Sequence, residues 1–192
     1  MKRNSFLRLI ASAGALIAVP FNSHAVRLLK SRLTKGFKVD AGADRFGQPI
    51  SLLEGDTFFT KVSAKDTDGD MYVFESTRVK KGGPSLHIHH QQDEWWYILE
   101  GEFAFKVGDE LYNAKAGDSV FGPRGVPHTF SKTNDGNARM LITFQPAGKM
   151  EMFFKAVSEG KLSKLSEAEQ DNYRKLHGFE RVGPALSHFK KF

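Results

Sequence analysis

The sequence contains no cysteine among its 192 residues. Disulfides and a lipid-modified cysteine anchor are therefore excluded, so the stability of the fold must come from its core and from any metal that it binds. The sequence also has no internal repeat, no low-complexity segment and no cluster of lysine and arginine interleaved with aromatic residues. Because binding to nucleic acid needs a basic surface of that kind, we expect no nucleic-acid partner.

The chain also lacks an apolar run long enough to span a bilayer. Near its start, the run Leu9–Val19 has about 11 residues, whereas a membrane-spanning helix needs roughly 20. A short basic segment precedes this run, and the small residues Ser23 and Ala25 follow it. This arrangement predicts a cleaved signal peptide over residues 1–25 in preference to a membrane anchor.

The basic segment has the sequence RNSFLR over residues 3–8, which resembles a twin-arginine export signal in which Asn4 replaces the second arginine. We therefore expect a periplasmic or secreted protein, exported by this or the ordinary route and without stable membrane insertion after the signal is cleaved. The signal carries three basic and no acidic residues, so its removal from the 28 Lys+Arg leaves 25 against 22 Asp+Glu. The basicity of the chain is therefore largely that of the signal.

The rest of the composition is typical of an all-β domain. Hydrophobic residues make up 40% of the chain, and 18 glycines and seven prolines indicate many turns. Residues 26–50 show no sustained period, so we expect an N-terminal arm there. Short runs separated by turns follow and predict a barrel or sandwich over residues 51–148. The predicted strands cover residues 57–62, 71–79, 86–90, 94–100, 102–107, 111–114, 119–121, 128–131 and 138–145.

Residues 149–192 are expected to form a helical extension that covers one face of the barrel. Apolar residues recur at helical spacing in Met150–Glu159. Ser166 and Glu169 have the spacing of a capping box, which predicts the start of a second helix, and Gly178 is expected to end it.

Histidines and one acid supply the residues with evident chemistry. His87 and His89 are two apart on a predicted strand, so their side chains lie on the same face. Glu94 begins the next strand after a short connection, and His128 begins a later strand. Three imidazoles and one carboxylate suit one divalent transition metal ion, such as Fe, Mn, Ni, Cu or Zn, and leave coordination positions open.

These residues fall within two sequence motifs. Residues 83–101, GPSLHIHHQQDEWWYILEG, resemble the first cupin motif, and residues 117–128, GDSVFGPRGVPH, resemble the second. The sequence departs from the motifs at Lys81, where an opening glycine is expected, and at Lys132, where a closing asparagine is expected. Neither position supplies a ligand, so the departures leave the predicted metal site unchanged.

The resemblance implies an all-β fold, the cupin (jelly-roll) β-barrel, here with C-terminal helices. It implies His87, His89, Glu94 and His128 as metal ligands. The chain is similar to small single-domain cupins that are compared with quercetin 2,3-dioxygenases. In those dioxygenases the ligand glutamate also accepts the proton of the substrate hydroxyl, so the resemblance implies a catalytic role for Glu94 as well.

Strand alternation predicts the wall of a substrate pocket beside the metal. Trp96 and Ile98 share the parity of Glu94, Phe130 shares that of His128, and Phe121 is assigned to the same wall. The alternative is that these four are ordinary core residues. The opposite face of the same strand is equally apolar at Trp95, Tyr97 and Leu99. A second sheet, the helices or a partner subunit could cover that face, so a homodimer stays open.

Three functions are compatible with this sequence, and each has a small molecule as its partner. The first is a metal-dependent dioxygenase acting on a small aromatic or enol-type compound. The second is a manganese-dependent enzyme of the oxalate or sugar-acid type, which needs a cationic pocket residue such as Arg78 or Arg124. The third is a non-catalytic protein of the cell envelope that binds a metal or a small molecule.

The signal-peptide assignment predicts the N-terminal residue of the mature chain. Because signal peptidase accepts only small residues before the cut, the mature chain should begin at Val26, and Ala25→Leu should block its release. Mass spectrometry of the exported protein measures both. Isolation of chains that retain residues 1–25 from a strain with active signal peptidase would contradict the assignment.

Overall fold

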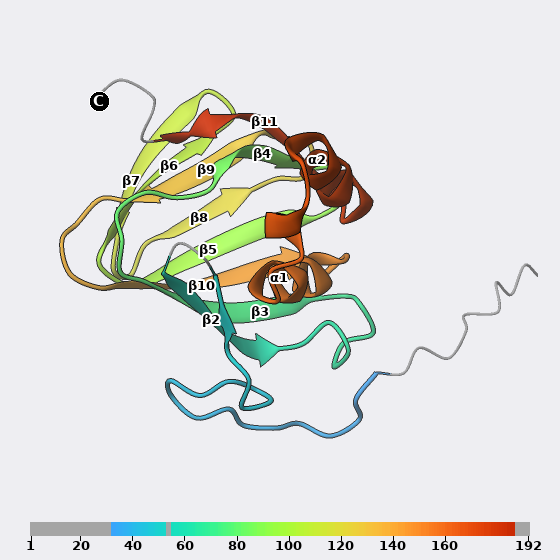
Figure 1. The fold of residues 1–192 in the computed structure, drawn as a ribbon. Helices are drawn as coiled ribbons and strands as arrows, with labels where there is room; N and C mark the ends of the chain where they lie inside the picture. The colour runs from blue at the N-terminus through green and yellow to red at the C-terminus, as the bar shows by residue number, and fades with distance from the viewer. Residues whose placement is uncertain (1–31, 53–54, 187–192) are drawn as a thin grey trace, which may run out of the picture. The chain divides into compact units, whose positions relative to one another are not determined.

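The computed structural model of the protein describes residues 32–52 and 55–186. The predicted signal peptide lies outside the described residues, as does the start of the predicted arm. Within the described part, strands form two antiparallel sheets whose inner faces pack against each other (Figure 1). Ring contacts between the sheets, such as Trp96 with Phe105 at 5.2 Å between centroids, show that the core lies between them.

The larger sheet has six strands in the order β1-β2-β3-β10-β5-β8. Its apolar residues alternate as expected, and β10 is buried at every second position. The strands are β1 (Ile50–Ser51), β2 (Asp56–Val62), β3 (Tyr72–Arg78), β5 (Asp93–Glu100), β8 (Ser119–Gly122) and β10 (Ala138–Gln145).

The smaller sheet has five strands in the order β11-β4-β9-β6-β7. It holds three of the four predicted metal ligands, on β4 and β9, which lie side by side. The strands are β4 (Ser85–His89), β6 (Glu102–Val107), β7 (Glu110–Lys115), β9 (His128–Lys132) and β11 (Phe179–Ala185). The predicted all-β architecture is confirmed: all nine predicted strands are present to within a residue or two at each end, and β1 and β11 are additional.

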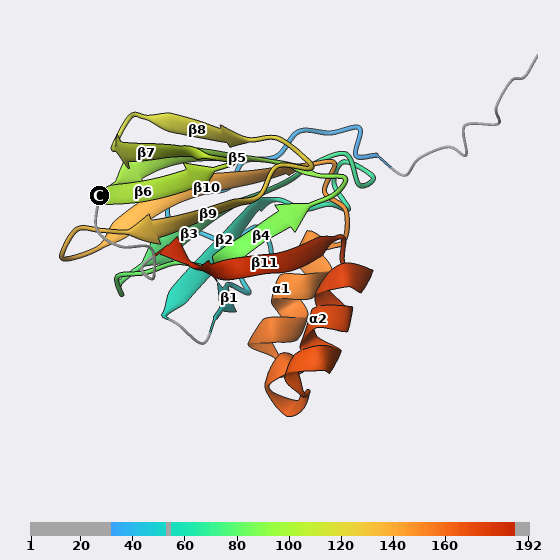
Figure 2. The same cartoon turned by 90° about the horizontal axis from the view of Figure 1, so that it is seen from above.

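Two helices lie together at one end of the sheets, as Figure 2 shows. They are α1 (Met150–Ser158) and α2 (Glu167–Leu176), joined through the short helix η1 (Leu162–Lys164). The predicted capping box is present. The Ser166 hydroxyl accepts a hydrogen bond from the backbone N–H of Glu169, and the Glu169 carboxylate accepts one from the backbone N–H of Ser166. No helix in the described residues is long and apolar enough to cross a membrane.

The chain after α2 forms a strand, which differs from the helical extension predicted over residues 149–192. Gly178 adopts a φ of 93°, which ends the helix, and residues 179–185 return to the smaller sheet as β11. This strand lies at the sheet edge and pairs with β4 alone, so Pro184 in it breaks no interior ladder. The register places Phe179 opposite His89 and Arg181 opposite His87.

The close approach of β4 to β9 generates a prediction about stability. A Cβ atom at Gly83, just before β4, would lie 1.7 Å from the carbonyl oxygen of Phe130 in β9. Gly83→Ala must therefore push these two segments of the chain apart. We expect a loss of about 1–3 kcal/mol in the free energy of unfolding, measured by urea titration. Gly36→Ala is the matched control, because a Cβ there meets nothing within 4 Å. Equal stability of the two variants would contradict the packing described.

Candidate metal centre

Strand pairing brings the four predicted ligands together. His87 on β4 is the direct cross-strand partner of His128 on β9, and His89 projects from the same face of β4 as His87. Glu94 comes from β5 of the larger sheet, where it lies opposite Gly122 of β8 and Phe144 of β10. The cluster therefore joins the two sheets inside the barrel.

All three imidazoles direct Nε2 at one oxygen of the acid. The distances to Glu94 Oε2 are 3.1 Å from His128, 3.4 Å from His89 and 3.8 Å from His87. One candidate ligand atom from each residue lies within 4.8 Å of all the others. Since first-row metal ions bind such atoms at about 2.0–2.2 Å, the four groups could hold one ion between them.

Backbone carbonyls fix the orientation of two of the rings. His87 Nδ1 donates to the carbonyl of Ser85 at 2.7 Å, and His128 Nδ1 donates to that of Val126 at 2.9 Å. In the neutral tautomer this leaves the Nε2 lone pair of each ring directed at the centre, as metal ligation requires.

His89 provides a separate test of whether the residues fit a metal. Neither of its ring nitrogens has a hydrogen-bond partner, although the side chain is fully buried. Burial lowers the pKa of His89 to about 4, so the ring is neutral near pH 7. A buried polar atom without a partner is costly, and a metal ion at Nε2 would satisfy it.

Glu94 supplies the negative charge of the centre. Burial of the Glu94 carboxyl would raise its pKa, but the three imidazoles that face the carboxylate outweigh that effect and hold the pKa well below its usual range. The cluster thus combines an ionised carboxylate with three imidazole nitrogens, which is the donor set that a divalent transition metal needs.

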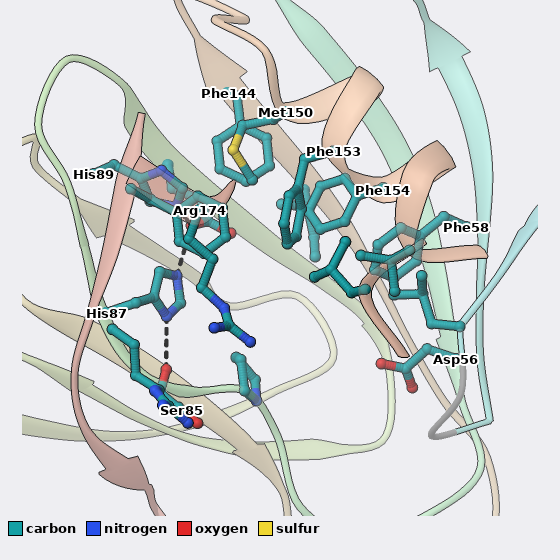
Figure 3. Close-up of a pocket in the computed structure, with 18 of the residues that line it drawn as sticks. Asp56, Phe58, Ser85, His87, His89, Phe144, Met150, Phe153, Phe154 and Arg174 are labelled. Carbon is teal, nitrogen blue, oxygen red and sulfur yellow. Dashed lines mark hydrogen bonds and ion pairs between the residues drawn. The ribbon is translucent and has the colours of Figure 1, made fainter. Parts of the chain in front are cut away.

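A cavity of about 420 Å³ opens beside the cluster, between the sheets and the two helices. His87, His89 and Glu94 line it, and most of its other lining side chains are apolar, including the Phe58, Phe144, Phe153 and Phe154 labelled in Figure 3. The aromatic residues come from both sheets and from α1, and they are Phe58, Phe74, Phe130, Phe144, Phe153, Phe154 and Phe179. A concave, largely apolar site with a few convergent polar groups is typical of small-molecule binding.

The predicted pocket wall agrees only in part with this cavity. Phe130 lines it, whereas Trp96 and Ile98 are completely buried in the core and do not. Trp96 still contacts the centre, because its ring lies 5.3 Å from that of His128. A Cβ atom at Gly122 would lie 2.7 Å from the Trp96 ring, so a glycine there leaves room for this contact.

The assignment of Phe121 to the pocket wall is wrong. Its side chain is 54% exposed on the outer face of the larger sheet. The register explains this, since Phe121 lies opposite Trp95, which points away from the core, while Val120 is the inward residue. Trp95 is itself 36% exposed, so neither the second sheet nor the helices cover it fully, and a homodimer through this face stays a prediction.

The cationic residues of the cavity also differ from those expected. Arg78 lines it and forms a buried ion pair with Asp56, whereas Arg124 lies outside and pairs with Asp93. Arg174 of α2 and Arg181 of β11 also line the cavity, and no pattern in the sequence marks them as pocket residues. Phe153 lines it as well, and the apolar face of α1 is the one signal in the sequence that indicates it.

The fold and the cluster together define a β-barrel protein with a three-histidine, one-glutamate centre that could hold a metal ion. Residues 74–144 match the cupin domain family, and they include all four residues of the cluster. This part of the chain is therefore a cupin domain, as the resemblance predicted.

Two curated relatives illustrate the range of proteins that carry this domain. The chain is 25% identical over 154 residues to quercetin 2,3-dioxygenase of Bacillus subtilis, covering 78% of this chain and 45% of that protein. It is 36% identical over 59 residues to the HTH-type transcriptional regulator PuuR of Escherichia coli, covering 31% of this chain and 32% of the regulator. The chain thus spans less than half the length of either relative.

Solved structures with a similar fold include an RmlC-like cupin from Shewanella frigidimarina, with a TM-score of 0.49 and 19% identity over 62% of this chain and 99% of that one. Another is KdgF from a Halomonas species, with a TM-score of 0.49 and 14% identity over 58% of this chain and 94% of that one.

The cluster predicts one bound ion per mature chain. Because His128 is fully buried and directed at the centre, His128→Ala should weaken binding of Zn²⁺ or Mn²⁺ by more than about 100-fold. His90→Ala is the matched control, since His90 neighbours the cluster but is exposed and pairs with Glu180. Elemental analysis and calorimetric titration provide the measurement. Equal metal content in the two variants would refute the assignment.

The buried neutral His89 predicts that the metal-free protein loses stability in mild acid. Its folded pKa of about 4 lies below the unfolded value of about 6.5, so the unfolded chain binds more protons between these pH values. Lowering the pH from 7 to 5 should cost about 2 kcal/mol through this residue. Urea titrations in a chelator should show a smaller loss in His89→Gln. An equal pH dependence in both proteins would exclude this source of the effect.

Proposed function

We propose that the protein is a metal-dependent dioxygenase that acts on a small aromatic or enol-type compound. The observation that carries the proposal is that the metal-binding cluster lines one side of an aromatic cavity. A structural metal site is closed by its four ligands, whereas a centre exposed to a cavity keeps a position for substrate. The 25% identity to a quercetin 2,3-dioxygenase over 78% of this chain supports the same activity.

His87, His89, Glu94 and His128 would hold the ion in this proposal. When bound, a metal of this type supplies a Lewis acid that polarises a substrate oxygen and a site for dioxygen. Glu94 is ionised and can accept the proton of the substrate hydroxyl. Because its pKa is low, Glu94 is a weak base, and the transfer requires a hydroxyl whose own pKa is lowered by the ion.

In this proposal the aromatic residues of the cavity position the substrate and exclude water. Phe144 and Phe179 pack against His89 with ring centroids at 5.2 and 5.3 Å, which excludes water from that side of the centre. Phe153 and Phe154 of α1 extend the wall across the cavity (Figure 3). A flat apolar substrate placed against these rings would be held beside the centre in a dry environment.

A second candidate is a manganese-dependent enzyme of the oxalate or sugar-acid type. The arginines in the cavity favour it, because an acidic substrate needs a cationic partner. The largely apolar wall with its seven phenylalanines favours the dioxygenase, since small polar acids gain little from such a surface. For either activity we propose an exported protein, on the evidence of its first 25 residues.

The experiment is oxygen uptake by mature protein of measured metal content, with a panel of flavonols, diketones and aromatic or enol-type carboxylic acids. We expect uptake that falls by about 100-fold or more in Glu94→Gln and is unchanged in His90→Ala. Release of carbon dioxide from oxalate without oxygen uptake would instead support the second candidate. If neither reaction occurs with any metal tested, the protein is a non-catalytic binder and the proposal fails.

A further inference from the structure

The cavity has a cationic end that the proposed dioxygenase mechanism does not use. Arg174 projects from α2, and Figure 3 shows its guanidinium pointing into the cavity on the side of His87. Its side chain is only 17% exposed, so solvent screens its charge weakly. Arg181 approaches from β11, where it is the direct cross-strand partner of His87. Both arginines therefore lie next to the candidate metal centre.

The hydrogen bonds of Arg174 hold it in place without using all its donors. Nη1 donates to Asp171 Oδ1 at 2.8 Å, and Nη2 donates to Gln170 Oε1 at 3.1 Å. Both partners belong to α2 itself, which fixes the direction of the side chain. Since a guanidinium has five N–H groups, donors remain for a ligand in the cavity.

The charges near this end do not balance. Asp171 accepts a hydrogen bond from Arg174 and a second one, at 3.3 Å, from Arg181. One carboxylate therefore pairs with two guanidinium groups. The acids that line the cavity are Asp56, which pairs with Arg78, and Glu94, which faces the three imidazoles. The group formed by Arg174, Arg181 and Asp171 therefore carries one positive charge in excess.

We propose that Arg174 binds a carboxylate group of the ligand, so that the cavity takes a small aromatic or enol-type monocarboxylic acid. A carboxylate matches both the single excess charge and the planar fork of a guanidinium. The apolar part of such an acid would lie against Phe153 and Phe154. The inference rests on the proposed function in one respect, that this cavity is the substrate site.

This assignment changes the expected substrate class. Flavonols and simple diketones are uncharged, and they would leave the guanidinium of Arg174 without an anionic partner. A site with a buried or half-buried charge discriminates strongly against ligands that fail to pair with it. An acid with an aromatic or enol group could pair its carboxylate with the arginine while its aromatic or enol part lies beside the metal centre.

The test compares an acid with its uncharged isostere. The probes are hydrocinnamate and hydrocinnamamide, and binding to the mature protein is measured by calorimetry with zinc bound and again after zinc is removed. We expect the acid to bind at least about tenfold more tightly than the amide in both states. In Arg174→Met the preference should disappear, through loss of acid binding with amide binding kept within about twofold.

Lys175→Met is the matched control. It removes the same charge from the same helix, but Lys175 is exposed, pairs with Glu180 and does not line the cavity. The preference for the acid should survive in this variant and should recover in part in Arg174→Lys. If Arg174→Met does not give a native circular dichroism spectrum, Arg174→Gln replaces it.

Several results would overturn the proposal. Equal binding of acid and amide, or no binding of either, would show that the cavity has no carboxylate site. A preference that survives Arg174→Met but vanishes when zinc is removed would place the carboxylate on the metal. Loss of the preference in Lys175→Met would assign it to net charge alone. Because binding is read with and without metal, failure of oxygen uptake leaves this test intact, and the reverse also holds.

Discussion

The structure depends on one electrostatic constraint, which is the burial of the Glu94 carboxylate inside the barrel. An ionised acid in that position is stable only if strong donors or a cation surround it. A metal ion held by the cluster would meet this requirement, and the three imidazoles converge on Glu94 because strand pairing sets His87 opposite His128 and strand parity sets His89 beside them. The register of β4, β5 and β9 therefore decides both the packing of the barrel and the chemistry that it can hold.

The chain outside the matched cupin domain completes the site. Residues 74–144 supply the cluster and part of the aromatic wall, while α1, α2 and β11 supply the opposite side of the cavity. Phe179 packs against His89, and Arg174 introduces a positive charge. Two cupins with the same cluster could thus bind different ligands through different extensions, which is consistent with function residing in the site more than in the fold.

Much of this could be predicted from the sequence, because its strongest signals are local. Alternating apolar residues and turn glycines located the strands, and the spacing of His87, His89 and Glu94 placed three ligands on two strands that follow each other in the sequence. What could not be predicted depends on register or on tertiary contact. Phe121 faces outward because β8 pairs with β5 in a register that no local pattern encodes. Arg174 is an ordinary helix residue in the sequence, and only the packing of the helices directs it into the cavity.

The most direct measurement of the central claim is X-ray absorption spectroscopy at the metal edge of the mature protein after loading with Zn²⁺. Coordination of one ion by three imidazoles and one carboxylate predicts a first shell of nitrogen and oxygen at about 2.0–2.2 Å with the outer-shell scattering of three imidazole rings. The Glu94→Gln variant should bind the ion more weakly and change the first shell. A spectrum with one imidazole or none would show that the three rings do not converge on the ion, and the account would be wrong.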